Sequence, residues 1–325
     1  MCLQVVLMLF MMVLMSTPVT AEQGLAIDPA TCLGCHSDRF SIKSFAASVH
    51  GKNACTSCHT DITDLVRHMK GEIKVQKVQC ERCHKRVNGE YYASVHIGKG
   101  VRCADCHTDI HTHSYWKGDK RIVVAKCIMC HDKEAAYQKS VHGKAVAAEN
   151  SDSAACHDCH NLHDIKPVGG PENHANRAFH TKVCLKCHSD DWMMKRNKVF
   201  NVAVKTYMNS YHGKNYRLGS PMKVAGCSDC HTAHSVLPRN DPASSINPAN
   251  ILKTCSKCHK RATASFTKFY AHGEPTDRHN YPILFYTFVG MTTLLVCVFV
   301  VFWIHTLFWM FRGFIENRHK KHRHL

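Results

Sequence analysis

The stretch Cys32-Leu33-Gly34-Cys35-His36 is the first of nine copies of one pattern, Cys-x-x-Cys-His, in this chain of 325 residues. The copies use all of the 20 cysteines except Cys2 and Cys297. In this pattern the two thiols lie about one helical turn apart, where they can add to the two vinyl groups of one porphyrin, and the adjacent histidine reaches the iron. A single copy could equally be half of a zinc site or a redox pair. Nine copies, each ending in histidine, predict nine covalently bound haem c groups.

Every motif contributes two thioether cysteines and one proximal ligand to the iron. The predicted haem-attaching cysteines are Cys32, Cys35, Cys55, Cys58, Cys80, Cys83, Cys103, Cys106, Cys127, Cys130, Cys156, Cys159, Cys184, Cys187, Cys227, Cys230, Cys255 and Cys258. The predicted proximal ligands are His36, His59, His84, His107, His131, His160, His188, His231 and His259.

A second pattern supplies candidates for the sixth position of each iron, whose occupant decides between electron transfer and catalysis. Ser-x-His, usually followed by Gly, comes after the first, third, fifth and seventh motifs, and Ala-His-Gly comes after the ninth. The even-numbered motifs are followed by a nearby histidine instead. The predicted distal ligands are His50, His96, His142, His212 and His272 after the odd motifs, and His68, His111 or His113, His163 and His234 after the even motifs. The choice between His111 and His113 is open, and the spare histidines His174 and His180 could replace another candidate.

The two patterns together define a repeat of two haems that starts near residues 32, 80, 127 and 184, with a half unit at residue 255. Such a period is typical of an array. Residues 22–280 show no long amphipathic helix and no alternating strand series, so the porphyrins must supply the apolar core. We therefore predict a multihaem cytochrome c fold, with mostly short α-helices and loops wrapped around a haem array and little β structure.

Apolar stretches at both ends of the chain predict export and anchoring. Residues 1–21 resemble a secretory signal peptide, with Val19 and Ala21 at the −3 and −1 positions of a cleavage site. No Lys or Arg precedes the apolar region, so an uncleaved N-terminal anchor is the alternative. Residues 281–312 are long and apolar enough for one transmembrane helix, and residues 313–325 form a basic tail. By the positive-inside rule the tail is cytoplasmic and the haem region faces the periplasm from the inner membrane.

The formal net charge of +17 does not by itself predict a nucleic-acid partner. Each haem carries two propionates, which ionise as ordinary carboxylates do, and these offset most of the positive charge. We therefore predict no binding of nucleic acid.

With its nine motifs, its Ser-Val-His-Gly recurrences and its C-terminal anchor, the chain resembles the multihaem c-type cytochromes of bacterial anaerobic respiration from Cys32 to about His272. The resemblance implies that bis-histidine haems pass electrons in sequence and that the chain is an electron carrier rather than an enzyme. It also implies a donor in the membrane, either quinol or a cytochrome subunit that oxidises quinol, and redox proteins of the periplasm as further partners.

One alternative is a multihaem reductase or oxidase of a small inorganic substrate, which would need one iron with an open site. Multihaem nitrite reductases characteristically use Cys-x-x-Cys-Lys at the catalytic haem, and this chain has no such motif. His305, inside the predicted span, has two interpretations. It is either a polar residue near the cytoplasmic interface or a functional group, such as a b-haem ligand shared with a partner or a residue near a quinone.

Overall fold

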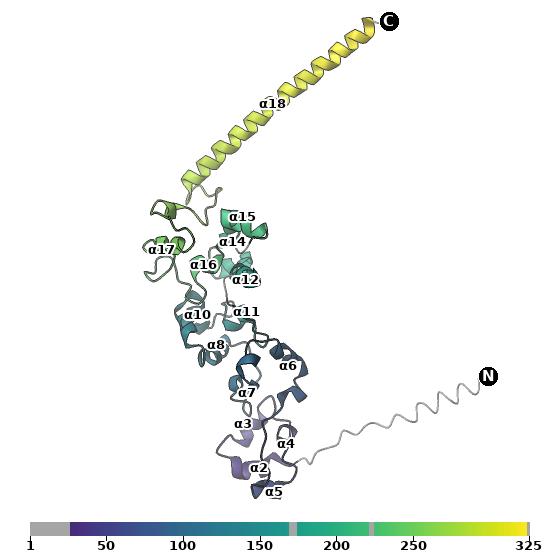
Figure 1. Cartoon of the computed structure of the whole chain (residues 1–325), viewed down its shortest axis with the longest axis vertical. Coiled ribbons are helices and arrows are strands. Elements are labelled where there is room, and N and C mark those ends of the chain that lie inside the picture. Colours follow the sequence, from purple (N-terminus) through teal and green to yellow (C-terminus); the bar gives the residue numbers. More distant parts are fainter. Residues whose placement is uncertain (1–26, 169–173, 221–223, 324–325) are drawn as a thin grey trace, which may run out of the picture. The chain divides into compact units, whose positions relative to one another are not determined.

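The computed structural model describes residues 27–168, 174–220 and 224–323 (Figure 1). It is helical, and these described ranges contain no β-strand, as the sequence predicts. The chain divides into two compact units. We call Met1–Asp132 with Glu149–Pro167 the first unit, and Lys133–Ala148 with Val168–Leu325 the second unit. The predicted signal peptide at residues 1–21 lies outside the described residues.

The elements of the first unit are short. They are α2 (Pro29–His36), α3 (Ile42–Ala46), α4 (Cys55–Cys58), α5 (Leu65–Met69), η1 (Cys80–Arg82), α6 (Lys85–Tyr92), η2 (Ile97–Lys99), α7 (Cys103–Cys106), α8 (Lys120–Ile128) and α11 (Cys156–His160), where η marks a 3-10 helix.

The second unit has slightly longer helices and one very long one. After η3 (Asp132–Ala135), which begins at the boundary, come α9 (Ala136–Lys139), α10 (Val141–Ala147), α12 (His174–His188), α13 (Asp191–Arg196), α14 (Ala203–Asn209), α15 (Tyr211–Arg217), α16 (Cys227–His231), α17 (Ile251–Ser256), η5 (Phe266–Lys268) and α18 (Pro282–Arg323).

Side chains alone make very little core. The buried hydrophobic residues of the described chain are Phe45, Val124, Tyr137, Val146, Ala155, Met194, Tyr207 and Val224. A domain of ordinary size is stabilised by the burial of far more apolar surface than this. The scarcity is what we expect where covalently bound porphyrins supply the apolar interior.

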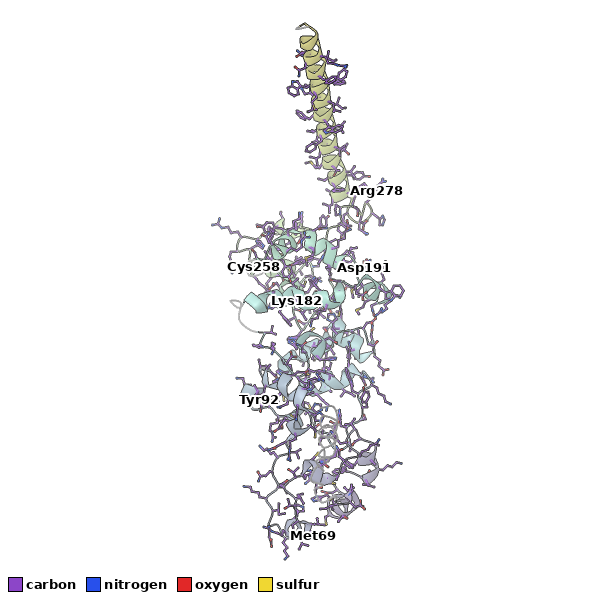
Figure 2. The ribbon with its side chains drawn as sticks, turned by 90° about the vertical axis from the view of Figure 1, so that its right-hand side faces the viewer. Met69, Tyr92, Lys182, Asp191, Cys258 and Arg278 are labelled. Carbon is purple, nitrogen blue, oxygen red and sulfur yellow. The ribbon has the colours of Figure 1, made fainter. Side chains whose placement is uncertain are left out.

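Helix α18 is continuous over 42 residues and starts with Pro282, a residue suited to the first turn of a helix (Figure 1). The stretch Pro282–Arg318 is long and apolar enough to cross a membrane, and none of its most apolar window is buried. Figure 2 shows its side chains standing out around the helix without covering elements. The helix continues through most of the segment that the sequence predicts as a basic tail, up to Arg323.

Candidate haem-binding sites

Each Cys-x-x-Cys-His motif occupies about one helical turn. In α4, for example, the amide N–H of His59 donates to the carbonyl oxygen of Cys55 over 2.9 Å, and His107 bonds to Cys103 in the same way over 2.8 Å. Such a bond spans four residues and places the first cysteine and the histidine on one face of the turn. This is the arrangement that thioether attachment and proximal ligation by one motif require.

An aspartate before the second cysteine organises three of the even-numbered motifs. Asp105, Asp158 and Asp229 each accept a hydrogen bond from the backbone N–H that precedes the first cysteine of their motif, over 2.6–2.8 Å. A carboxylate in the first turn satisfies an N–H that the helix leaves unpaired and interacts favourably with the helix dipole. These aspartates were not predicted as site residues, although Cys-x-Asp-Cys-His recurs in the sequence.

Eight of the nine proximal histidines face a predicted distal histidine. The pairs, written with the proximal residue first and the distance between ring centroids, are His36 and His68 (6.3 Å), His59 and His111 (6.3 Å), His84 and His50 (6.0 Å), His107 and His163 (6.4 Å), His131 and His96 (6.1 Å), His188 and His142 (6.1 Å), His231 and His272 (6.1 Å), and His259 and His212 (6.2 Å). The histidines His160 and His234 each make contacts of their own, and their roles as proximal and distal ligands stay predictions.

The separation of these rings fits an iron between them. Each metal–imidazole bond is about 2 Å long and each ring nitrogen lies roughly 1 Å from its ring centre, so a bis-histidine iron needs about 6 Å between ring centres. The observed range of 6.0–6.4 Å meets this requirement. The residues present therefore fit bis-histidine haem at eight motifs.

The pairs follow an interleaved rule that spacing along the chain does not reveal. The Ser-x-His histidines face the proximal histidine two motifs further on, so that His50 follows the first motif but faces His84 of the third. The histidines after the fourth and sixth motifs face two motifs back, as His163 faces His107. The rule changes at the ends of the array, where His68 faces His36 and His272 faces His231.

A repeated backbone hydrogen bond separates the environments of His111 and His113. The residue before the histidine in Ser-x-His donates its N–H across the fold over 2.9 Å, and the donor and acceptor pairs are Val49 and His113, Val95 and Ile165, and Val141 and Val236. Ile165 and Val236 each stand two residues after a distal candidate, and His113 stands two residues after His111. In the register of the repeat, His113 therefore has the position of Ile165 and Val236.

The side chain of His113 also has a different partner. Its Nδ1 atom lies 3.0 Å from a carboxylate oxygen of Asp109, and its ring meets His107 edge-on with 5.5 Å between centroids. His111 instead lies nearly parallel to His59, with 13° between the ring planes. The geometry places His111, and not His113, opposite a proximal histidine that lacks another facing partner.

In two copies of the Ser-x-His-Gly pattern the serine begins a helix and the glycine packs closely against the backbone of the preceding helix. Ser140 and Ser210 are N-cap residues whose hydroxyl oxygens accept from the N–H of the glycine, over 3.0 and 3.3 Å. Glycine is required after the histidine because a side chain there would clash with the backbone of the preceding helix. A Cβ atom on Gly213 would lie 2.0 Å from the carbonyl oxygen of Tyr207, in the helix that precedes the cap. The cap and the glycine thus fix the turn that presents the histidine.

Burial keeps these imidazoles in the neutral form that binds metal. Burial, with His272 and His188 as further causes, lowers the pKa of His231 to about 4. Burial is also the main cause of the lowered pKa values of His142, His212 and His272. Because imidazole must be deprotonated to coordinate a metal, such surroundings favour ligation at neutral pH.

The two motifs of each repeat lie side by side at their first cysteines. The pairs of neighbouring thiols, in which one thiol contributes to the pKa shift of the other, are Cys32 with Cys55, Cys80 with Cys103, Cys127 with Cys156, and Cys184 with Cys227. The attachment points of two successive haems are therefore neighbours in all four complete repeats. This supports the two-haem repeat as a structural unit as well as a sequence period.

The spare histidines have other surroundings. The Nδ1 atom of His180 lies 2.5 Å from the hydroxyl oxygen of Ser228, inside the eighth motif. The side chain of His174 lies outside the described residues. His305 is in α18, far along the helix from the haem region.

A sequence model of the cytochrome c3 family matches residues 95–189. This stretch contains the fourth to seventh motifs and the distal candidates His96, His111, His113, His142 and His163. No curated protein and no solved structure gives a significant match to the chain. The helical fold and the family match together support a multihaem c-type cytochrome, similar over residues 95–189 to cytochrome c3, with covalently bound haem c and a role in electron transfer.

Proposed function

We propose that this chain is a membrane-anchored electron carrier that holds nine haem c groups. The observation that carries the proposal is the set of eight proximal histidines that each face a second histidine at 6.0–6.4 Å. When bound, haem supplies an iron that accepts and releases one electron. At these eight motifs two imidazoles would hold each iron and would leave no open site for a substrate. This favours electron transfer over the alternative of a reductase or oxidase.

The proposal assigns the distal ligands by the observed pairs. His68, His111, His50, His163 and His96 serve motifs one to five in that order, and His142, His272 and His212 serve motifs seven, eight and nine. His113 is not a ligand in this assignment. Its ring supports the His107 site from the side and its backbone carbonyl holds Val49.

The cysteine contacts support transfer between successive haems. Within each repeat the first cysteines of the two motifs are neighbours. Between repeats, Cys83 is close enough to Cys58, and Cys255 to Cys230, to raise the pKa of the second cysteine of the preceding motif. Haems attached at these neighbouring cysteines would be close enough together for fast electron tunnelling. Electrons therefore pass along the motifs in sequence order inside each unit.

Helix α18 is the proposed membrane anchor. Its apolar side chains are exposed along the whole candidate span, which is unfavourable in water and favourable in lipid. Arg312 and Arg318 lie toward its C-terminal end, so the positive-inside rule places that end in the cytoplasm and the haems in the periplasm. The donor is then quinol or a quinol-oxidising membrane subunit, and the acceptors are periplasmic redox proteins.

The proposal can be tested on the purified full-length protein in detergent. Haem content should be nine per chain, and exposure of the reduced protein to carbon monoxide should leave its absorption spectrum unchanged. Nitrite, hydroxylamine and sulfite should not be turned over. A stoichiometric carbon monoxide adduct together with turnover of one of these substrates would show an open catalytic site and refute the electron-carrier assignment.

A further inference from the structure

The segment that joins the haem region to α18 contains a proposed haem ligand. His272 lies ten residues before Pro282, the first residue of the helix. A Cβ atom on Gly273, the next residue, would lie 2.9 Å from a terminal methyl of Leu284 in the first turn of α18. The rings of Tyr270 and Tyr281 meet edge-on with 5.3 Å between centroids. The backbone beside His272 is thus in contact with the start of the candidate membrane span.

The same segment is also tied to α14. The Nδ1–H group of His272 donates to the carbonyl oxygen of Ala203 over 3.0 Å and lies 3.1 Å from the hydroxyl oxygen of Thr206. The buried carboxylate of Glu274 forms an ion pair with Lys205 over 3.1 Å. The Ala203 bond fixes the proton on Nδ1, so that Nε2 is free to face His231 across 6.1 Å.

The distal histidines assigned to motifs seven and nine are carried by different elements. His142 lies on α10 and His212 lies on α15. At motif eight the facing histidine precedes Gly273, whose Cβ position lies close to Leu284 of α18. If α18 spans the bilayer, the His231–His272 site is the one that the fold attaches directly to the membrane surface.

The residues at the start of α18 suit an interface between water and lipid. The guanidinium of Arg278 lies over the ring of Tyr286, 5.7 Å from its centroid, and the Phe285 ring meets Tyr286 at 5.5 Å. Arg278 stands at the foot of the helix in Figure 2. Aromatic and basic side chains of this kind gather where a membrane helix leaves the hydrocarbon. A lipid-soluble donor meets the protein at this level.

We propose that the haem held by His231 and His272 is the one that takes up electrons from a lipid-soluble quinol at the membrane surface. The inference rests on the proposed function and names its donor class and its receiving site. Oxidation of one quinol to quinone releases two protons to water and two electrons. The electrons reduce two ferric irons, one after the other, through this site. Because tunnelling slows exponentially with distance, the site nearest the membrane receives them first.

The test uses the full-length protein in liposomes with a water-insoluble menaquinol analogue as donor. His272→Met keeps a sixth ligand but changes the spectrum of one low-spin ferric haem, which assigns the signal of that site. Rapid freeze-quench paramagnetic resonance of the wild type then shows which ferric signal disappears first after quinol is generated. We expect the assigned signal to be lost first. A methionine ligand raises the potential of the entry site, so we also expect quinol-driven reduction of the other haems to slow at least tenfold in His272→Met, while dithionite still reduces every haem.

A second variant provides the assignment if His272→Met does not fold. Thr206→Val retains the ligand but removes one acceptor near its Nδ1–H. This weakens imidazole donation to iron and raises the midpoint potential of one haem. Thr267→Val is the control, because the Thr267 hydroxyl donates to the carbonyl oxygen of Ala264. It should shift no haem potential.

Earlier loss of another ferric signal, or reduction of the other haems of His272→Met by quinol at the wild-type rate, would overturn the inference. Failure of quinol to reduce the wild-type protein would also overturn it. In that case the electron-carrier function would still stand, because it rests on ligation and is tested by carbon monoxide binding.

Discussion

In the first unit the Nδ1 atoms of His50, His59 and His68 are buried without a hydrogen-bond partner, whereas in the second unit the Nδ1–H of His272 donates to the carbonyl oxygen of Ala203. The first three belong to the sites of motifs three, two and one, and the fourth belongs to the site of motif eight. A ligand histidine whose second nitrogen donates to a carbonyl is a stronger donor to the metal. We therefore expect haem at the sites of motifs one to three to favour reduced iron more strongly than haem at the site of motif eight.

The largest expected effect is common to both units. If haem attachment is prevented by expression without a maturation system, both units should lose their compact helical structure, because few apolar side chains are buried in either. Far-ultraviolet circular dichroism and limited proteolysis measure this. A haem-free chain in which one unit resists proteolysis as the holoprotein does would show that this unit has a core of its own.

The next effect comes from the close glycines, one in each unit. A Cβ atom on Gly51 would lie 2.4 Å from the carbonyl oxygen of Ala46, and one on Gly213 would lie 2.0 Å from that of Tyr207. Gly51→Ala and Gly213→Ala should each lower the free energy of unfolding by about 1–3 kcal/mol and disturb the sites of His50 and His212. Thermal denaturation followed by haem absorbance measures the change.

Gly89→Ala in α6 is the matched control for these glycine variants. Nothing lies within 4 Å of its Cβ position, so alanine in this helix should be neutral or stabilising by up to about 1 kcal/mol. Equal destabilisation by all three substitutions would mean that close packing is not the reason for glycine after the histidine.

A smaller effect distinguishes the serine of the Ser-x-His-Gly pattern in the two units. Ser140 in the second unit is fully buried and accepts from the N–H of Gly143 over 3.0 Å, whereas Ser48 in the first unit is partly exposed and accepts from His50 over 3.2 Å. Ser140→Ala should cost about 1–2 kcal/mol, and Ser48→Ala should cost less. Chemical denaturation of the two variants compares them directly, and the reverse order would contradict the role given to burial.

The finest difference is in reduction potential. The site of His231 and His272 should have a lower midpoint potential than the sites that contain His50, His59 and His68, because the Nδ1–H of His272 is bonded to a carbonyl oxygen and the Nδ1 atoms of those three histidines are not. A redox titration followed by magnetic circular dichroism, with the site assigned by Thr206→Val, measures the order. A higher potential at motif eight would show that burial or charge outweighs hydrogen bonding there.

Much of the site could be predicted because the chemistry is local. Haem attachment needs two thiols and an imidazole within five consecutive residues, so the motifs could be found by inspection, and the recurrence of Ser-x-His-Gly drew attention to His50, His142 and His212. The helical fold followed from the lack of an apolar core and of alternating strands. The continuation of α18 beyond residue 312 was not predicted. The charged residues there mark the end of the apolar span, but they do not end the helix itself.

The pairing could not be predicted because it is a long-range property. His50 faces His84 and not the nearer His36, and this depends on how successive repeats interleave in space. The choice between His111 and His113 was open because both lie close to the fourth motif. The hydrogen bond from Val49 to the His113 carbonyl, which recurs at Ile165 and Val236, shows that His113 has the place in the repeat that those two non-ligand residues have.

The measurement that tests the bis-histidine electron carrier most directly is electron paramagnetic resonance of the fully oxidised native protein, with spin quantified against haem content. We predict low-spin ferric signals that account for all of the haem, with no high-spin component. A high-spin signal equivalent to one or more haems per chain, in protein with intact haem content, would contradict the ligand pairs and favour a catalytic site.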